Sequence, residues 1–405
     1  MSSPCITNMK KISIGVCVCF ALLVVSCITQ EGNKQEESKP LFPIYRDHKY
    51  GYIDKAGKIV VKPEFDQIYY VFNEGLAYVF NSDKRGFIDK TGKMVIQLEA
   101  DSARPFSEGL ALIYVFTEDK KELRSGYIDR TGKAVIKPQF GWAGDFSEGL
   151  ACVIIGNSYY EGKCGYIDKT GELIIKAQFD AADNFSEGLA SVNINGHRAE
   201  GAVIGGKWGY IDKSGKMVIE PQFDNARPFV YGMARVKVGD KWGYIDRMGE
   251  IIAKPQFTMA DDFSEGLARV KIGGRAIIPS MDDGKWGYID KTGEYVIKPQ
   301  FEDANQFSEG LAGVKIHDQW GYIDKTGKFV IEPQFDAIPN GDFSEGLACV
   351  SNGYIDKTGK IIIKCKFRGM DKFRNGLARV WIDDIDKSEW AYINKTGRYI
   401  WKPTK

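Results

Sequence analysis

The chain has 405 residues, of which 45 are glycine and 13% are aromatic. Lysine plus arginine (55) almost balances aspartate plus glutamate (54), and the net charge of +1 excludes the electrostatic pattern of a nucleic-acid-binding protein. Abundant glycine and scattered aromatic residues are typical of short strands separated by turns, so we expect an all-β protein without long helices.

The first part of the chain has the layout of an export signal. Lys10 and Lys11 precede an apolar run at residues 12–25, and Ser26 then stands directly before Cys27. The run is shorter than the about 20 residues that a membrane span needs. This layout resembles a bacterial lipoprotein signal peptide, which implies cleavage before Cys27 and lipidation of its thiol and new amino group. A stray thiol, or a buried cysteine of an uncleaved signal, is the alternative.

We therefore expect a signal peptide at residues 1–26, a lipidated cysteine with a flexible tether at 27–40 and a folded body at 41–405. Residues 28–40 are polar and lack apolar periodicity, as a tether does. The resemblance implies attachment to a membrane of the bacterial cell envelope. Ile28 is not the aspartate that retains some lipoproteins at the inner membrane, so the outer membrane is expected. Met1 and Met9 are both candidate starts.

A repeat organises the rest of the chain. The quartet Gly-Tyr-Ile-Asp, or a close variant, recurs at intervals of 32 to 44 residues, which is the range of solenoids, propellers and arrays. It predicts an array of nine to ten units that bury their apolar faces against one another. The quartets begin at Gly51, Gly86, Gly126, Gly165, Gly209, Gly243, Gly287, Gly321, Gly353 and Ala391.

Each unit contains three apolar stretches in the same order, as at residues 207–212, 217–223 and 263–270. The first two form a predicted β-hairpin, because a glycine able to take positive φ closes the Asp-Lys-Ser-Gly or Asp-Lys-Thr-Gly turn and the aspartate caps it. Phe-Ser-Glu-Gly-Leu-Ala predicts a second tight turn. The proline of Lys-Pro-Gln-Phe, as at Pro138, Pro255 and Pro299, favours a strand end or an edge strand, where pairing stops.

A longer period brings two insertions into register. Residues 165–242 align with 243–320 without a gap, and the extra residues fall at 195–206 and 273–284. If units alternate sides, both insertions emerge along one edge, which is a candidate functional surface that includes Arg198 and Arg275. Recent duplication of a two-unit block with solvent-exposed loops is an equally good interpretation.

The string Lys-Trp-Gly-Tyr-Ile-Asp-Lys-Thr-Gly-Lys resembles the WG-repeat, or KWG-repeat, family of bacterial proteins over residues 45–403. The tryptophan itself is present only in later units, at Trp208, Trp242, Trp286, Trp320 and Trp390. The resemblance implies a tandem array of β-hairpin repeats but carries no general activity. We expect an elongated or superhelical stack, with a β-propeller as the alternative, because ten unequally spaced units exceed the roughly 4–8 blades of a typical propeller.

The motifs of an enzyme are missing from the sequence. His48, His197 and His317 are the only histidines and none lies in a recognisable motif. The aspartate and glutamate that recur in each unit are interpreted as turn caps rather than as acid and base. We therefore expect no enzymatic activity, no cofactor and no metal.

The predicted function is that of a non-catalytic envelope lipoprotein that presents a repeat surface to a protein or glycan ligand. The alternative is a module directed at carbohydrate or cell wall through exposed Trp208, Trp242, Trp286 and Trp320, since aromatic rings offer π faces to ligands. Packing of these rings between neighbouring units is the favoured interpretation.

Four cysteines follow Cys27. Cys152 and Cys164 flank one expected strand connection, and Cys349 and Cys365 flank another. Export permits disulfides, so a bridge within each couple is expected if the Cα atoms approach within about 7 Å. A metal site is less favoured because no Cys-x-x-Cys spacing occurs.

Overall fold

Every regular element of the computed structural model is a β-strand within the residues that it describes, which are 39–69, 71–82, 84–119, 122–156, 162–199, 202–274, 284–338, 341–384 and 387–403. Over these ranges no helix has the length and apolar character needed to cross a membrane. The predicted signal peptide, Cys27 and residues 28–38 lie outside the described residues.

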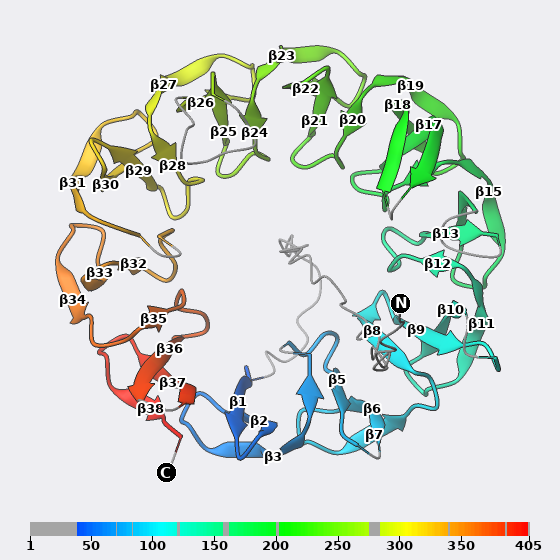
Figure 1. Ribbon diagram of the computed structural model, residues 1–405, viewed down its shortest axis with the longest axis horizontal. Coiled ribbons are helices and arrows are strands. Elements are labelled where there is room, and N and C mark those ends of the chain that lie inside the picture. Colours follow the sequence, from blue (N-terminus) through cyan, green and yellow to red (C-terminus); the bar gives the residue numbers. More distant parts are fainter. Residues whose placement is uncertain are drawn as a thin grey trace, which may run out of the picture. The chain divides into compact units, whose positions relative to one another are not determined.

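The strands form ten small antiparallel sheets that follow one another around a ring (Figure 1). Each sheet is a blade, and its strands are neighbours in chain order. In a four-stranded blade the short first strand lies toward the ring centre and the fourth strand forms the outer rim (Figure 1). The predicted all-β tandem repeat is therefore confirmed, in its propeller form.

The first five blades occupy residues 42–223. Blade 1 has β1 (Phe42–Arg46), β2 (Lys49–Ile53) and β3 (Ile59–Phe65); blade 2 has β4 (Gln67–Ile68), β5 (Ala77–Phe80), β6 (Arg85–Ile88) and β7 (Met94–Gln97); blade 3 has β8 (Ser102–Ser107), β9 (Leu110–Phe116), β10 (Leu123–Asp129) and β11 (Ala134–Phe140); blade 4 has β12 (Trp142–Ala143), β13 (Ala151–Ile155), β14 (Lys163–Ile167) and β15 (Leu173–Phe179); blade 5 has β16 (Ala181–Ala182), β17 (Leu189–Ala199), β18 (Ala202–Asp212) and β19 (Met217–Phe223).

The other five blades complete the ring. Blade 6 has β20 (Asn225–Ala226), β21 (Met233–Val238), β22 (Lys241–Asp246) and β23 (Ile251–Phe257); blade 7 has β24 (Met259–Ala260), β25 (Leu267–Ile272), β26 (Lys285–Asp290) and β27 (Tyr295–Phe301); blade 8 has β28 (Asp303–Ala304), β29 (Ala312–Ile316), β30 (Gln319–Ile323) and β31 (Phe329–Phe335); blade 9 has β32 (Ala348–Val350), β33 (Gly353–Ile355) and β34 (Ile361–Lys364); blade 10 has β35 (Gly369–Met370), β36 (Leu377–Asp384), β37 (Lys387–Asn394) and β38 (Tyr399–Trp401).

The turn between the third and fourth strands forms as the sequence predicts. In blade 5, the Asp212 carboxylate accepts backbone N–H groups of Ser214 (2.9 Å) and Lys216 (3.1 Å). Gly215 has φ +83°, a conformation that glycine adopts without steric cost. The aspartate of the repeat is thus a turn cap.

The proline of the outer strand lies inside a bulge rather than at a strand end. Trp208 pairs with Phe223 and Tyr210 with Ile219, with a register shift between them, so pairing continues past Pro221. The prediction of an edge strand is confirmed, whereas the prediction that pairing stops at the proline is wrong. A proline is accommodated because the fourth strand is an edge strand and the bulge needs no donor there.

In nine of the ten blades, a tyrosine on the strand next to the outer strand joins neighbouring blades. Tyr210 is fully buried, its ring centroid lies 4.8 Å from that of Phe229 in blade 6, and its hydroxyl donates to the Arg227 carbonyl at 2.7 Å. The same bond, at 2.5 to 2.8 Å, is formed by Tyr52, Tyr127, Tyr166, Tyr210, Tyr244, Tyr288, Tyr322, Tyr354 and Tyr392. In blade 2, Phe87 keeps the ring contact with Phe106 without a hydroxyl.

The last blade meets the first through this same bond. Tyr392 donates to the Pro43 carbonyl at 2.8 Å, and its ring centroid lies 5.6 Å from that of Phe42. Ile53 and Trp401 belong to the same buried cluster. Each sheet consists of consecutive strands only, so the ring closes by packing of two blade faces and not by a shared sheet. The repeats therefore close into a propeller instead of the elongated stack, which was the favoured expectation.

Candidate functional site

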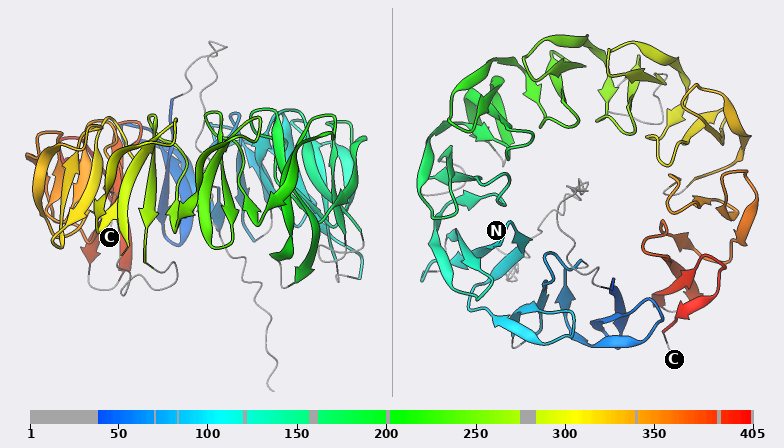
Figure 2. Two further views of the ribbon diagram at one scale, coloured as in Figure 1. Left: turned by 90° about the horizontal axis from the view of Figure 1, so that it is seen from above. Right: turned by 180° about the vertical axis from the view of Figure 1, so that it is seen from behind.

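The ring has two faces with different chemistry. The turns that join first to second strands and third to fourth strands lie at one end of every blade, which we call the motif face. The hairpins that join second to third strands lie at the other end, which we call the hairpin face. The β17–β18 hairpin extends beyond the rest of the ring on that face, the lower side of the left view in Figure 2.

The Ser-Glu-Gly turn of the motif face ties each blade to the next. Ser147 of blade 4 donates to the Phe185 carbonyl of blade 5 at 2.8 Å. The Glu148 carboxylate accepts the Gly188 N–H at 3.0 Å and pairs with the Lys213 ammonium at 3.0 Å, both in blade 5. The glutamate is therefore a turn cap, as predicted, but the turn that it caps belongs to the neighbouring blade.

This contact recurs around the motif face. The carboxylate-to-glycine pairs are Glu74–Gly109, Glu108–Gly149, Glu148–Gly188, Glu187–Gly232, Glu265–Gly310, Glu309–Gly346 and Glu345–Gly376. The residues that recur from unit to unit thus hold neighbouring blades of the ring together.

Blade 6 departs from this pattern. Val230 and Tyr231 stand where most other blades carry serine and glutamate, and Tyr231 is 55% exposed with φ +54°. The Lys291 ammonium lies 5.5 Å from its ring centroid. Met248, at 81% exposure, replaces the threonine of the other turn. The local loss of both motifs is the signal in the sequence that distinguishes this blade.

The hairpin face varies between blades. A two-residue turn at Gly239 and Asp240 joins β21 to β22, whereas β17 and β18 stay paired out to Ala199 and Ala202. The hairpin between β25 and β26 opens from the same face, so the two aligned insertions do share an edge. The two insertions share this edge because all blades are oriented alike, and not because successive units alternate sides.

Cross-comparison with known proteins identifies the repeat. A family model described as "WG containing repeat" matches residues 50–84, 86–115, 126–159, 165–196, 208–242, 242–275, 286–319, 320–352 and 353–384. The chain belongs to the WG-repeat family. The matched segment 208–242 begins in the third strand of blade 5 and ends after the second strand of blade 6. One sequence repeat therefore spans a blade junction.

No curated protein matches the WG-repeat chain. Among solved structures, similarity extends to a putative TolB from Agrobacterium tumefaciens (TM-score 0.28, 12% identity, 53% of this chain and 87% of that one). It also extends to the β-propeller domain of the Trilobed protease from Pyrococcus furiosus (TM-score 0.29, 10% identity, 91% and 100%). These scores are too low to carry a functional argument.

The tryptophans of the WG motif pack between blades. Trp286 is only 4% exposed and belongs to the core between blades 7 and 8. Trp208, Trp242 and Trp320 are partly buried against the cores beside them. The interpretation that these side chains pack between blades is therefore supported for all four indoles, while three of the indoles retain some exposed surface.

Of the two candidate arginines, the structure describes one, Arg198. Arg198 on β17 donates to the Cys164 sulfur of blade 4 at 3.1 Å and is half-buried. Arg275 lies outside the described residues. Arg198 therefore makes a contact within the ring and is not fully exposed.

All four cysteines of the ring are free thiols, so the structure contains neither expected disulfide. Cys349 on β32 and Cys365 after β34 are separated by β33, and two strand spacings of about 4.8 Å exceed the reach of a disulfide. Cys152 and Cys164 lie on adjacent strands and share a hydrogen bond, which raises the pKa of the Cys152 thiol and lowers that of Cys164.

Charged residues meet where the first strands end. Arg104 pairs with Asp145 of the next blade at 3.1 Å, and burial raises the pKa of that carboxyl. Burial also raises the pKa of Asp183, which accepts a hydrogen bond from Ser191 at 2.5 Å. Within the described parts of the chain, no group of three or more His, Cys, Asp or Glu residues is arranged to hold a metal ion.

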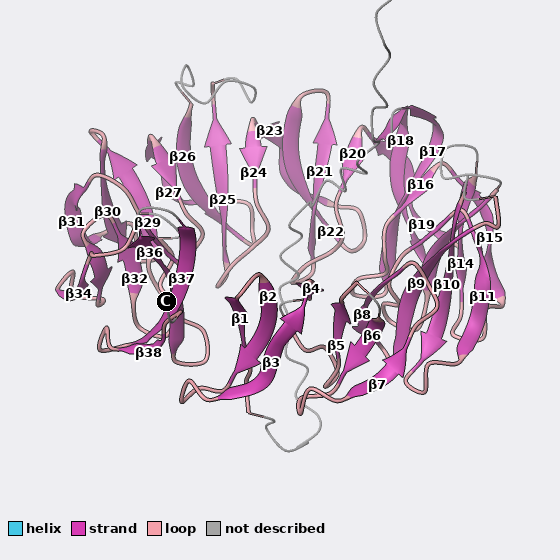
Figure 3. Cartoon of the chain, turned by 60° about the horizontal axis from the view of Figure 1, so that its bottom comes forward, coloured by secondary structure: helices cyan, strands magenta, loops and turns pink. Residues whose placement is uncertain are grey.

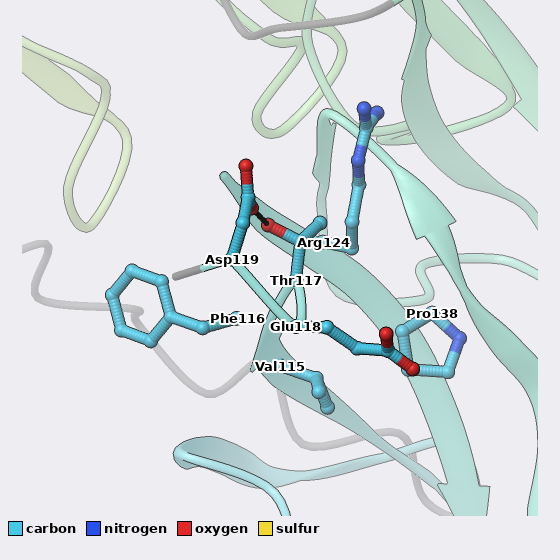
Figure 4. Close-up of a pocket in the computed structure, with 7 residues that line it drawn as sticks. All are labelled: Val115, Phe116, Thr117, Glu118, Asp119, Arg124 and Pro138. Carbon is cyan, nitrogen blue, oxygen red and sulfur yellow. Dashed lines mark hydrogen bonds between the residues drawn. The ribbon is translucent and has the colours of Figure 1, made fainter. Parts of the chain in front are cut away.

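A hollow of about 550 Å³ lies at the β9–β10 hairpin of blade 3 (Figure 4). Its lining is Val115, Phe116, Thr117, Glu118, Asp119, Arg124 and Pro138. Thr117 donates to the Asp119 carboxylate at 2.6 Å, and Arg124 donates to the Gly156 carbonyl at 3.1 Å. Several of its polar groups thus serve to shape the hairpin.

Proposed function

We propose that this WG-repeat protein is a non-catalytic binding protein of the cell envelope that presents the hairpin face of its ring to a protein or glycan ligand. One observation carries the proposal: the motif face repeats the same contacts from blade to blade, whereas the hairpins opposite differ in length and sequence. Variable loops on a rigid scaffold are where binding surfaces are usually built.

The recurring polar groups have structural partners that support a non-catalytic role. The aspartates cap turns, the glutamates accept N–H groups of the next blade, and the tyrosine hydroxyls bind neighbouring carbonyls. A group whose hydrogen bonds hold the ring together is poorly placed to move protons or attack a substrate.

Replacement of residues 195–206 by the Gly-Asp turn of blade 6 tests the binding surface. We expect the full chain with this short hairpin to bind peptidoglycan sacculi or purified envelope protein at least about ten-fold more weakly, since loss of a few contacts has this size. Lys213→Ala, on the motif face, is the matched control and should bind as the parent does. Unchanged binding by the hairpin variant together with lost binding by Lys213→Ala would reverse the assignment of the faces.

The proposed place of the ring is the outer membrane, attached through a lipid on Cys27. The apolar run and Ser26-Cys27 support this anchor. Labelled palmitate should enter the parent chain in cells and be absent from Cys27→Ser. Absence of label from the parent chain would contradict the anchor.

A further inference from the structure

Trp242 of blade 6 is surrounded by positive charge. The guanidinium carbons of Arg227 and Arg235 lie 5.9 and 5.8 Å from the indole centroid, and the Lys237 ammonium lies 5.8 Å from it. The three cations come from the end of β20 and from β21, so strand pairing within one blade brings them to the ring. Lys237 is the direct cross-strand partner of Trp242.

The other tryptophans of the motif lack this combination. The Arg269 guanidinium carbon lies 4.2 Å and the Lys271 ammonium 5.4 Å from the Trp286 ring centroid. The indole and Lys271 are both buried by other parts of the chain. Trp320 is partly exposed like Trp242, and its cross-strand partner Lys315 is neutralised by Asp318 at 2.9 Å.

The charge beside Trp242 is only partly compensated. Arg235 pairs with Asp262 of blade 7 at 2.7 Å. The equivalent of Asp262 in blade 4 is Asp145, which neutralises Arg104, the counterpart of Arg227. Because Arg235 already occupies Asp262, no carboxylate of the described residues forms an ion pair with Arg227 or Lys237.

The nearest acidic groups are occupied elsewhere. Asp224 pairs with Lys207 at 2.6 Å and accepts the Gly239 N–H at 2.7 Å. Asp183, which faces Arg227 from blade 5, is half-buried and bonded to Ser191, and its desolvation raises the pKa of the carboxyl. Arg227 is exposed, so its guanidinium can meet a ligand from solution.

We propose that Arg227, Lys237 and Trp242 form a binding site for an acidic saccharide. The carboxylate or phosphate of the sugar lies against the Arg227 guanidinium and the Lys237 ammonium, because charge-assisted hydrogen bonds to such groups are the strong ones. The apolar face of the sugar ring packs on the indole. This inference rests on the proposed binding function and names the ligand class of one position on the ring.

The test measures binding of the full chain to four immobilised probes: oligogalacturonate, its methyl ester, a phosphomannan and poly-glutamate. We expect oligogalacturonate or phosphomannan to bind, and the comparison of the two shows whether a carboxylate or a phosphate is preferred. The methyl ester should bind at least about ten-fold more weakly than oligogalacturonate. Poly-glutamate bound as tightly as the acidic sugars would overturn the saccharide assignment.

Variants locate the site. Arg227→Ala, Lys237→Ala and Trp242→Ala should each weaken binding of the acidic sugar about ten-fold or more, whereas Trp320→Ala should change it less than about two-fold. Arg227 is exposed, so its variant should keep the thermal transition of the parent. Equal losses from Trp242→Ala and Trp320→Ala would overturn the site. If the short-hairpin variant loses binding while Arg227→Ala does not, this inference fails and the proposed function stands.

Discussion

Tyr244→Ala is expected to lower the free energy of unfolding by about 3–5 kcal/mol, the range for removing a large buried ring. Tyr244 is almost completely buried, its ring meets Phe263 of blade 7 at 5.3 Å between centroids, and its hydroxyl donates to the Asp261 carbonyl at 2.6 Å. The substitution therefore leaves a cavity at a blade junction and removes a bond between blades. Denaturant unfolding followed by tryptophan fluorescence measures the change.

Tyr244→Phe is the matched control for this experiment. It keeps the ring and removes the hydroxyl, so a loss of about 1–2 kcal/mol is expected from the unpaired carbonyl. Blade 2 carries Phe87 at the equivalent position, which shows that the fold tolerates this exchange. If the alanine variant were no less stable than the phenylalanine variant, the packing of this ring would not hold the blades together.

Deletion of residues 369–405 is expected to cause the second large effect. It removes blade 10 and exposes Ile44 and Ile53 of blade 1, which are fully buried in the closed ring. It also uncovers the core that blade 9 shares with blade 10, including Tyr354 and Ile363. We expect calorimetry to show a thermal midpoint lower by roughly 10 °C or more, because several kcal/mol of burial are lost.

A circular permutant provides the control for the deletion. It begins at Asp224 and ends at Phe223, and a linker joins Pro403 to Lys39. Each blade is a continuous stretch of chain, and the natural ring already contains one junction without a covalent link, between blades 10 and 1. The permutant should thus melt within a few degrees of the parent. A midpoint as low as that of the deletion would show that covalent continuity, rather than packing, maintains the ring.

Local structure was predictable from the sequence because short motifs encode it. The Asp212-to-Gly215 turn follows from residue type and spacing, and it is present. Ring closure was not predictable, because it depends on the small angle between neighbouring blades. The unequal spacing that argued against a ring arises from hairpins such as β17–β18, which lengthen one face without changing the blade junction (Figure 3).

The candidate site was predictable only in part. Trp242 belongs to a motif and could be singled out, but Arg227 and Lys237 are separated from it in sequence and reach it only through the pairing of β20, β21 and β22. The partners of Glu148 were not predictable for the same reason, since they lie in the following blade. Contacts between blades require the ring geometry, which no single repeat contains.

Small-angle X-ray scattering of the chain beginning at Lys39 tests the central claim, that ten blades close into one ring. An open stack of ten sheets spaced about 10 Å apart would extend to about 100 Å. The ring predicts a maximum dimension well below this value and a scattering curve that matches the closed coordinates. A maximum dimension near 100 Å, or one that grows further when blade 10 is duplicated, would contradict closure.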